Sequence, residues 1–398
     1  MTNEKPMSSE IPTGSESPVS SGNLMGGDGL AGTGAPAGTR TPARTDPVST
    51  EQSVERARAV LAGTGEWPAE SARAVWYGLR AAGALPPPDA DPAVLVALAR
   101  EAGYRSTPGP LAETLLVARP LLAAAGLTAP DGPLAVTAGP LDVRFANVDT
   151  AGRVGPLGAG GTDDALRVSG TLRRVAWAGA ADAVVVLTVG PSTGPVLLLL
   201  DAVDLLRVEG TNLAGEPRDD LVLIDVAVPA ERVRRIPAAL ARQAQWRSGL
   251  ARAALIAGAA RRCVDLTIAH TGSRVQFGRP LSHFQAVKQE EARLIEETAL
   301  VGAAVEAAAA ALADPDSAEF AAWVAAAQAC ASVAEITRIA HQLHGAIGFT
   351  ELSRLHLSTT RLWSWRDEDG TEQAWARRIG RRVVEDGSDR LWPLVTGA

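Results

Sequence analysis

The stretch from Ala340 to Thr371 reads AHQLHGAIGFTELSRLHLSTTRLWSWRDEDGT and decides how the rest of the chain is interpreted. It holds a glycine turn, GAIG at 345–348, directly after a helical pattern. An acidic cluster, DED at 367–369, follows and is closed by Gly370 and Thr371. A glycine allows close approach to the main chain, and a positioned carboxylate can act as a general base. The stretch therefore suggests a cofactor held beside a base.

The composition is that of a globular protein with an acidic balance. With 398 residues and 46% hydrophobic content, the chain can bury a large core, which we expect to be divided among two or three domains. A net charge of −7 disfavours a nucleic-acid partner, which would favour a basic face. No apolar run approaches the roughly 20 residues of a membrane span, so no span is expected. These features predict a protein of a reducing, cytoplasmic compartment.

Cysteine and histidine placement gives no sign of a disulfide or a metal site. Cys263 and Cys330 lie in apolar helical patterns, so buried free thiols are expected. His341 and His344 lie one helical turn apart, but no third ligand is near them in the sequence. We expect packed or solvated histidines and no metal.

The periodicity of the chain changes three times. Residues 1–50 are rich in Gly, Ser, Thr and Pro and are predicted to be a disordered tail. Residues 51–130 show helical spacing, and residues 131–230 contain short apolar runs separated by glycines and prolines, as in a small β-sandwich or barrel. Residues 231–398 return to helical spacing. The predicted class is α+β: an N-terminal helical domain, a middle β domain and a C-terminal helical domain.

The C-terminal region carries long alanine-rich helical patterns. They are predicted over residues 246–270, 284–313 and 318–343, with a shorter one over residues 371–384. Three long helices and one short one suit a four-helix bundle.

Two motifs within this region are specific when taken together. RVQFGRP at 274–280 stands between the first two predicted bundle helices, and QLHGAIGF at 342–349 follows the third. Together they closely resemble the acyl-CoA dehydrogenase family of FAD flavoproteins. The helix–sheet–helix order also matches that family, and the resemblance covers about residues 50–386.

The resemblance implies FAD between bundle and sheet in a homo- or hetero-oligomer, a dimer or tetramer. It assigns Arg274, Gln276 and Phe277 to the diphosphate and adenine side of an FAD in an adjacent subunit. A guanidinium suits a diphosphate, and an aromatic ring can cover an adenine. Taken alone, the residues leave another interpretation open, in which Arg274 caps a helix end and Phe277 is core.

The resemblance assigns further flavin contacts near the quoted stretch. Gln342, Gly345 and Ala346 match the family's second contact, with Ala346 replacing one of two adjacent glycines. Thr371 and Gln373 match contacts that follow a Gly-Thr pair.

The resemblance also points to a catalytic base. Counting 24 residues from Gly345 reaches Asp369, where the family commonly has a glutamate. That glutamate removes the proton alpha to the thioester while a hydride leaves the beta carbon. Aspartate is shorter by one C–C bond, roughly 1.5 Å, and a misplacement of roughly 1 Å can slow a reaction about a hundredfold. Neighbouring Glu368 is an alternative base. Some family members keep the base on the first bundle helix, but the matching residue here is Ser248, which cannot serve.

The middle region departs from the family pattern. Residues 170–182 align with a block that borders the flavin ring, but Arg174 stands in place of its tryptophan and Ala176 in place of its threonine. The nearest approach to the family's Gly-Ser-Asp loop is GTD at 161–163. The flavin-ring side is thus less well matched than the diphosphate side.

The resemblance implies FAD-dependent α,β-desaturation of an acyl-CoA thioester with Asp369 as base, within lipid metabolism. Electrons would pass to an electron-transfer flavoprotein. Two alternatives stay open. In the first, the chain is a non-catalytic or cofactor-completing subunit of a hetero-oligomeric acyl-CoA dehydrogenase. In the second, it is a flavin oxygenase or oxidase of the same fold.

Overall fold

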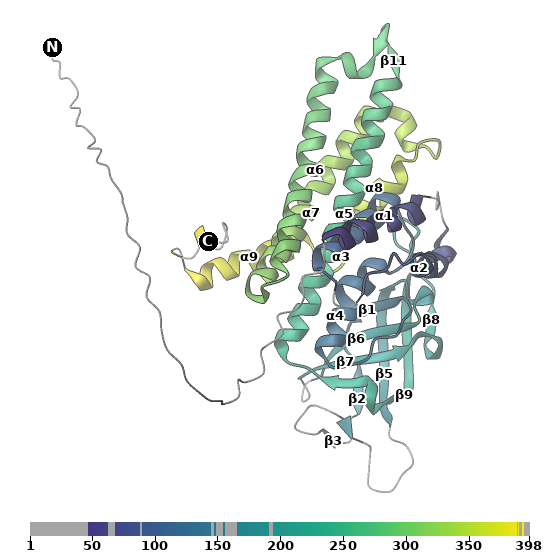
Figure 1. The fold of residues 1–398 in the computed structure, drawn as a ribbon, viewed down its shortest axis with the longest axis vertical. Coiled ribbons are helices and arrows are strands. Elements are labelled where there is room, and N and C mark those ends of the chain that lie inside the picture. The colour runs from purple at the N-terminus through teal and green to yellow at the C-terminus, as the bar shows by residue number, and fades with distance from the viewer. Residues whose placement is uncertain are drawn as a thin grey trace, which may run out of the picture. The chain divides into compact units, whose positions relative to one another are not determined.

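In the described part of the chain, helices come first, two packed sheets follow, and long helices come last (Figure 1). The structure, a computed structural model, describes residues 47–62, 68–87, 90–144, 147–148, 154–155, 165–190 and 194–387, with positions 389, 392 and 393. Residues 44–398 form one compact unit. The predicted tail, apart from its last four residues, and the GTD sequence at 161–163 lie outside the described residues.

The N-terminal region is helical, as predicted. It comprises α1 (Pro47–Ala62), the short η1 (Ala69–Ser71), α2 (Ala72–Ala81), α3 (Pro92–Arg105), the π-helical η2 (Glu113–Ala118) and α4 (Arg119–Ala124). Helix α3 starts after Asp91, because the Asp91 side chain accepts a hydrogen bond from the amide of Ala93 at 2.9 Å. Val94, Leu98 and Ala102 of α3 are buried in the same core cluster as helix α5 of the bundle. This packing fixes the position of η2 beside the bundle.

The middle region is a sandwich of two four-stranded sheets. One sheet has the order β1-β6-β7-β10, with β1 (Leu134–Ala138), β6 (Ala183–Gly190), β7 (Gly194–Asp201) and β10 (Val233–Arg235). The other has the order β2-β5-β9-β8, with β2 (Asp142–Arg144), β5 (Ala165–Ala176), β9 (Arg218–Pro229) and β8 (Leu206–Val208). Strands β3 (Asn147–Val148) and β4 (Val154–Gly155) form a separate small pair. The inner faces of the two large sheets share one apolar core. The predicted sandwich is confirmed.

A bulge in β5 faces the bundle side of the sandwich. The pairing of β5 with β9 shifts register between Leu172 and Val175. Arg174 takes a left-handed backbone conformation there, with φ +53°, and its amide donates to the Asp220 carboxylate at 2.8 Å. A β-bulge re-aims the side chains it carries. The bulge is what brings Arg173 and Arg174 to the pocket described below.

The described part of the C-terminal region contains five α-helices rather than the four predicted. They are α5 (Ala238–Ser273), α6 (Gln285–Ala311), α7 (Pro315–His344), α8 (Leu355–Arg366) and α9 (Glu372–Asp386). The predicted positions of α5, α6, α7 and α9 are confirmed, and α8 was missed. Helix α8 buries Leu355, Thr359 and Leu362, and also Ser358 and Ser364, so it lacks the single apolar stripe by which a surface helix is found.

Helix α7 packs into the core of this bundle. By length and apolar composition alone, Ser317–Phe349 could cross a membrane, which the sequence analysis did not anticipate. In the folded chain 56% of its most apolar window is buried. Its inner side contributes Ala325, Ala329 and Val333 to the core shared with α5. A soluble bundle's core helix meets the same criteria of length and composition.

A β-hairpin closes the end of the bundle farthest from the sheets (Figure 1). Strands β11 (Val275–Gln276) and β12 (Arg279–Pro280) pair antiparallel between α5 and α6. The turn residues Phe277 and Gly278 both have positive φ, as a tight two-residue hairpin turn requires. The RVQFGRP motif therefore forms a projecting hairpin.

Candidate active site

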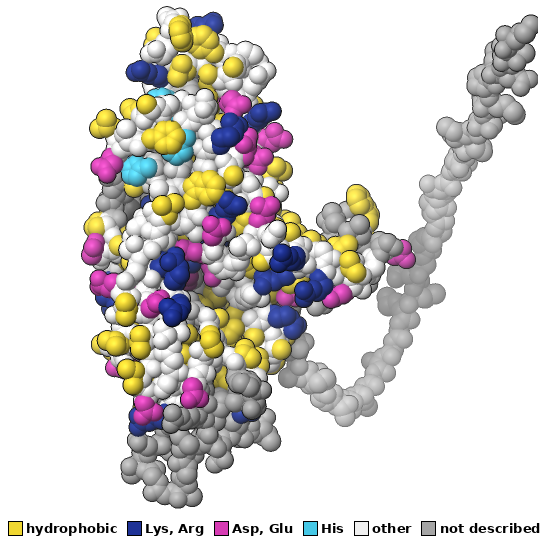
Figure 2. Space-filling view, turned by 180° about the vertical axis from the view of Figure 1, so that it is seen from behind, with side chains coloured by type: hydrophobic (Ala, Val, Ile, Leu, Met, Phe, Trp, Pro, Cys, Tyr) yellow, Lys and Arg dark blue, Asp and Glu magenta, His cyan; other side chains and the backbone are white. Residues whose placement is uncertain are grey.

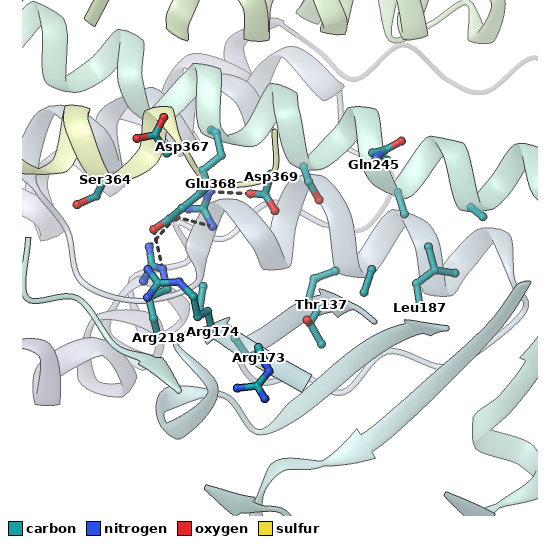
Figure 3. Close-up of a pocket in the computed structure, with 18 of the residues that line it drawn as sticks. Thr137, Arg173, Arg174, Leu187, Arg218, Gln245, Ser364, Asp367, Glu368 and Asp369 are labelled. Carbon is teal, nitrogen blue, oxygen red and sulfur yellow. Dashed lines mark hydrogen bonds and ion pairs between the residues drawn. The ribbon is translucent and has the colours of Figure 1, made fainter. Parts of the chain in front are cut away.

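The main pocket lies where the sheets meet the bundle and encloses about 640 Å³ (Figure 3). Its lining comes from β1, the β5 bulge, β6, the start of β9, α5, α8 and the segment after α8. The lining residues are Val136, Thr137, Ala138, Arg173, Arg174, Val175, Ala176, Leu187, Arg218, Ala241, Arg242, Ala244, Gln245, Ser248, Arg252, Ser364, Asp367, Glu368 and Asp369. Figure 3 shows Glu368 and Asp369 on the helical side and Arg173 and Arg174 on the strand side. A cavity of this size suits a small-molecule ligand.

Asp369, the predicted base, lies in this pocket but is already paired. Its carboxylate accepts a hydrogen bond from Nε of Arg252 at 2.8 Å, and its side chain is 36% exposed. Asp369 has φ +61° and the following Gly370 has φ +148°, so the turn places the carboxylate by a strained backbone. The structure confirms that the residue reaches the pocket, while its role as a base stays a prediction. Ser248, the alternative position, also lines the pocket.

Arg252 is the residue on which the carboxylates of the pocket converge. It comes from α5 and is buried. Its guanidinium lies 2.8 Å from Glu113 Oε1 and 3.3 Å from Glu368 Oε2, in addition to its bond to Asp369. Burial opposes its charge, but the carboxylates outweigh burial and hold the pKa of Arg252 well above its ordinary value. Arg252 is therefore a permanent cation inside the pocket.

Glu368 is held by a second arginine. Arg218, at the start of β9, donates from Nε and Nη2 to the two carboxylate oxygens of Glu368, both at 2.8 Å. Burial opposes ionisation of Glu368, but Arg252 and Arg218 prevail and lower its pKa. A carboxylate held ionised by two guanidiniums is a poor proton acceptor. This geometry argues against Glu368 as a substitute base.

These contacts belong to a larger cluster of buried charges, which we call the ionic network. It consists of Glu113, Glu216, Arg218, Arg252, Arg361, Glu368 and Asp369. Glu216 accepts from Arg218 at 3.1 Å and from Arg361 at 3.0 Å, and Trp365 donates to it at 2.9 Å. The network ties η2, α5, α8 and the sheet region together at one junction. Its charges compensate one another, so the floor of the pocket has nearly balanced charge.

Five members of the network were not identified from the sequence, namely Glu113, Glu216, Arg218, Arg252 and Arg361. Two of them, Glu113 and Arg252, each stand alone in an apolar helical run. Charged residues are rarely buried unless they are paired, so each isolated charge was a usable signal that a partner exists. Burial raises the pKa of Glu113 even though Arg252 acts against this. Glu113 also lies on the π-helical turn η2, an irregularity often found at functional sites.

The predicted diphosphate-side residues lie on the projecting hairpin. Arg274 ends α5, with its amide donating to the carbonyl of His270 at 2.9 Å, and Gln276 lies on β11. Phe277 is 91% exposed and contacts Phe284 edge to face, with ring centroids 6.1 Å apart. The interpretation of Phe277 as a core residue is wrong. An exposed aromatic at a hairpin tip suits contact with another molecule.

A second group lies at the end of α7. Gln342, Gly345 and Ala346 border a cavity of about 580 Å³ that His341 and Phe349 also line. Gly345 has φ +65°, and a Cβ there would meet nothing within 4 Å, so its main chain is open to a ligand. Figure 2 shows histidine and apolar side chains gathered on this part of the bundle.

The histidines of this region pack against rings. His341 stacks on Phe349 with centroids 4.4 Å apart, and His344 stacks on His270 at 4.6 Å. Burial lowers the pKa of all three histidines, so they are neutral at physiological pH. Neutral stacked rings form part of the wall beside Gln342.

The last two predicted contacts lie at the start of α9. Thr371 is its N-cap and accepts a hydrogen bond from the amide of Ala374 at 3.3 Å. Gln373 accepts one from Arg377 at 3.3 Å. The predicted cofactor residues thus lie at three places, namely the hairpin, the end of α7 and the start of α9. None of them lines the main pocket.

The residues fit FAD on one side and not on the other. The hairpin and the end of α7 present an arginine, an exposed aromatic and an open glycine backbone, which suit a diphosphate and an adenine. At the main pocket, Arg174 and Ala176 stand in the wall where an aromatic and a hydroxyl would suit a flavin ring. A cationic side chain and a buried ionic network replace them. The main pocket does not fit an isoalloxazine.

The geometry defines a protein with an N-terminal helical region, a β-sandwich and a C-terminal helical bundle, and comparison with known proteins gives the family that has this architecture. The family model "Acyl-CoA dehydrogenase, C-terminal domain" matches residues 241–384. The chain belongs to the acyl-CoA dehydrogenase family, whose members are oxidoreductases that bind FAD.

The relatives show where the similarity lies. Acyl-CoA dehydrogenase FadE34 of Mycobacterium tuberculosis is 32% identical over 296 residues, which are 72% of this chain and 37% of FadE34. Acyl-CoA dehydrogenase IpdE2 of Mycolicibacterium smegmatis is 41% identical over 93 residues, 23% of this chain and 28% of IpdE2. The chain thus spans 28% to 37% of the length of these two relatives.

A solved structure shares the whole fold. A chain of the ChsE4–ChsE5 complex of Mycobacterium tuberculosis superimposes with a TM-score of 0.70 at 21% identity, covering 86% of this chain and 99% of that one. At this identity the match supports the fold alone. It confirms the helix–sandwich–bundle order predicted from periodicity.

Proposed function

We propose that this chain is the cofactor-completing subunit of a hetero-oligomeric acyl-CoA dehydrogenase. It contributes the hairpin and the end of α7 to an FAD site shared with a related partner chain, and the partner supplies the base. The assembly carries out α,β-desaturation of an acyl-CoA thioester. The observation that carries this proposal is the pairing of Asp369 with buried Arg252, together with the almost full exposure of Phe277 on the hairpin at the far end of the bundle.

The residues divide into a set that would hold FAD and a set that lines the main pocket. Bound FAD supplies the acceptor for a hydride from the beta carbon. On this chain, Arg274 pairs with the diphosphate, Phe277 covers the adenine, and Gly345 allows the cofactor close to the main chain. On the pocket side, Asp369 would have to leave Arg252 before it could take a proton. Its Oδ2 atom already accepts a charge-assisted hydrogen bond of 2.8 Å from Arg252.

The complex of two differently named chains, ChsE4 and ChsE5, supports a hetero-oligomeric assembly by analogy of fold. In this proposal the electrons leave to an electron-transfer flavoprotein, and the assembly works in the cytoplasm on lipid-derived thioesters. The identity of the acyl group is set by the pocket of the partner.

A second candidate function is desaturation in this chain's own pocket with Asp369 as base. It is favoured by the position of Asp369 in the main pocket and by its partial exposure. It requires that substrate binding separate Asp369 from Arg252. The two candidates give opposite results for the variant Asp369→Asn.

The test compares the chain alone with the chain co-expressed with an acyl-CoA dehydrogenase-like paralogue as partner. We expect the chain alone to be colourless and the complex to hold one flavin for each pair of chains. Anaerobic acyl-CoA should bleach the complex, and Asp369→Asn should leave that bleaching intact. Phe277→Ala and Arg274→Gln should each reduce flavin content, whereas the exposed control Arg293→Gln on α6 should not.

The opposite pattern would establish the second candidate. A chain that is yellow when purified alone, bleaches with acyl-CoA and loses bleaching in Asp369→Asn is a dehydrogenase in its own right. Oxygen consumption with hydroxylated product in a parallel aerobic assay would identify an oxygenase. Flavin content and bleaching are measured in one spectrum, so the three outcomes are separable.

A further inference from the structure

We propose that the main pocket is a receptor for a small molecule with a carboxylate and an apolar body, and that Arg174 binds the carboxylate. The inference rests on the proposed function in one respect, since it requires that a flavin ring not occupy this pocket. It assigns a binding role to a cavity that the FAD half-site on the hairpin leaves unused.

Arg174 is held at the pocket wall by its backbone rather than by its side chain. It lies in the β5 bulge with φ +53°, and its amide is fixed by the Asp220 carboxylate at 2.8 Å. Left-handed conformations are uncommon for residues other than glycine and cluster at ligand sites. The bulge thus presents this side chain to the cavity at a cost in backbone strain.

Among the described residues, no carboxylate lies within ion-pair distance of the Arg174 guanidinium. Its neighbour Arg173 is different, because Asp220 lies 3.3 Å from Arg173 Nη1. Arg218 and Arg252 are neutralised by the ionic network, and Arg242 has Glu319 at 3.9 Å. Arg174 is therefore the arginine of the pocket lining for which the described residues supply no ion-pair partner. An anionic ligand would supply the missing partner.

A carboxylate is the anionic group that best matches the guanidinium of Arg174. A guanidinium forms two parallel hydrogen bonds to a carboxylate, which adds orientation to charge. Because the floor of the pocket is nearly balanced in charge, a ligand with a single negative group is matched by a single unpaired arginine. A ligand of high charge would meet the acids Asp367, Glu368 and Asp369.

The rest of the lining suits an apolar body. Val136, Ala138, Leu187, Ala241 and Ala244 form apolar walls from β1, β6 and α5. The volume of about 640 Å³ lies within the range of roughly 300–1,000 Å³ typical of ligand pockets. Thr137, Gln245 and Ser248 can hydrogen-bond an oxygen on that body. The cavity therefore fits a molecule of medium size with one acidic end.

The experiment is calorimetric titration of the purified chain with three probes: decanoate, 1-decanol and coenzyme A. Decanoate carries a carboxylate and an apolar body, 1-decanol carries the body alone, and coenzyme A carries phosphates without an acyl chain. We expect saturable binding of decanoate only. Arg174→Gln should weaken it by about 10- to 100-fold, the range of one charge-assisted hydrogen-bond pair. Arg174→Lys, which keeps the charge, should restore part of the affinity, and Arg381→Gln on α9 should change nothing.

Three results would overturn the inference. These are no saturable binding of decanoate, equal binding of 1-decanol, and binding of coenzyme A that shows the same dependence on Arg174. The last would make the pocket a phosphate site. Circular dichroism of each variant excludes unfolding as the cause of lost binding. The visible spectrum of the same sample reports flavin, so a yellow chain contradicts the proposed function independently of the titration.

Discussion

Arg252 is the single residue that most determines what the main pocket can do. It is buried and stands within 3.3 Å of three carboxylates. Removing one partner of a buried ion pair leaves uncompensated charge and costs about 3–5 kcal/mol. We therefore expect Arg252→Met to lower the free energy of unfolding by about that amount, measured by urea denaturation of the isolated chain.

The matched control is Arg242→Met on the same helix and in the same pocket. Arg242 is exposed, and its nearest carboxylate, Glu319, is 3.9 Å away. An exposed arginine of this kind contributes little, so its removal should change the free energy of unfolding by about 0.5 kcal/mol or less. Equal effects from the two substitutions would show that the ionic network does not stabilise the chain.

Glu368 makes the folding stability of the chain depend on pH. Its pKa is lowered in the folded chain by Arg252 and Arg218 despite its burial. A carboxyl with a depressed folded pKa stabilises the protein above its unfolded pKa of about 4.3, and that contribution is lost as the pH falls through the folded pKa. Glu368→Gln should therefore lower the melting temperature at neutral pH. The difference from the wild type should shrink as the pH is lowered below about 4.

Thermal unfolding followed by circular dichroism at a series of pH values measures this. Glu335→Gln is a suitable control, because Arg338 lowers the pKa of Glu335 as well but the pair lies on the exposed face of α7. Its effect should be small at every pH. A difference between Glu368→Gln and the wild type that is the same at all pH values would contradict the assignment.

For single residues, the sequence indicated which residue reaches the pocket but not which residue it pairs with there. The family resemblance, counted from Gly345, pointed to Asp369, and the structure places that residue in the main pocket. The ion pair of Asp369 with Arg252 spans 117 residues and depends on how α5 packs against the segment after α8. No local pattern contains that information. The isolated charge of Arg252 in an apolar helix was the only trace of it.

The junction between α8 and α9 depends on two glycines that face one tryptophan. A Cβ on Gly370 would come within 2.7 Å of the Trp375 ring, and one on Gly249 within 2.8 Å. Trp375 is buried and seats α9 against α7. Gly370→Ala adds a steric clash to a φ of +148°, so we expect destabilisation of about 1–3 kcal/mol and displacement of Asp369.

The control is Gly272→Ala near the end of α5, where a Cβ would meet nothing within 4 Å. Alanine should be neutral there or stabilise the helix by up to about 1 kcal/mol. Chemical denaturation of both variants tests the prediction. If Gly370→Ala were as stable as the wild type, the turn that places Asp369 would not be constrained by Trp375.

Helices and strands were predictable from the sequence where they carry a regular apolar pattern. They were not predictable where buried polar residues interrupt that pattern or where a strand is irregular. The long helices α5, α6 and α7 follow from their apolar spacing, and the sandwich follows from short apolar runs. Helix α8 was missed because its serines and threonines are buried with its leucines. The bulge at Arg174 is set by the pairing of β5 with β9 and leaves no signature in the sequence of β5 alone.

At the scale of the whole molecule, the residues that suit FAD and the residues that suit catalysis lie in different places. The hairpin projects at the end of the bundle farthest from the sheets, while the main pocket lies at the sheet–bundle junction (Figures 1 and 3). A cofactor spanning both in one chain would meet Arg174 and the ionic network at its ring end. A cofactor of a partner chain would meet only the hairpin and the end of α7. Assembly with a partner resolves this conflict.

Ligand linkage gives a direct test of that division. A ligand that binds only the folded state stabilises it by about 2.7 kcal/mol when present at a hundred times its dissociation constant. We therefore expect added FAD to leave the melting temperature of the isolated chain unchanged and to raise that of the flavin-stripped complex by several degrees. For domains of this size the shift corresponds to about 2–4 °C for each kcal/mol.

The variant Phe277→Ala separates the sources of this stabilisation. Because Phe277 is exposed, its removal should not alter the melting temperature of the isolated chain, yet it should reduce the FAD-induced shift in the complex. Glu290→Gln on α6 serves as the matched control, since its ion pair with Arg338 lies outside the hairpin. An FAD-induced shift in the isolated chain that survives Phe277→Ala would place a complete flavin site within this one chain and contradict its role as a completing subunit.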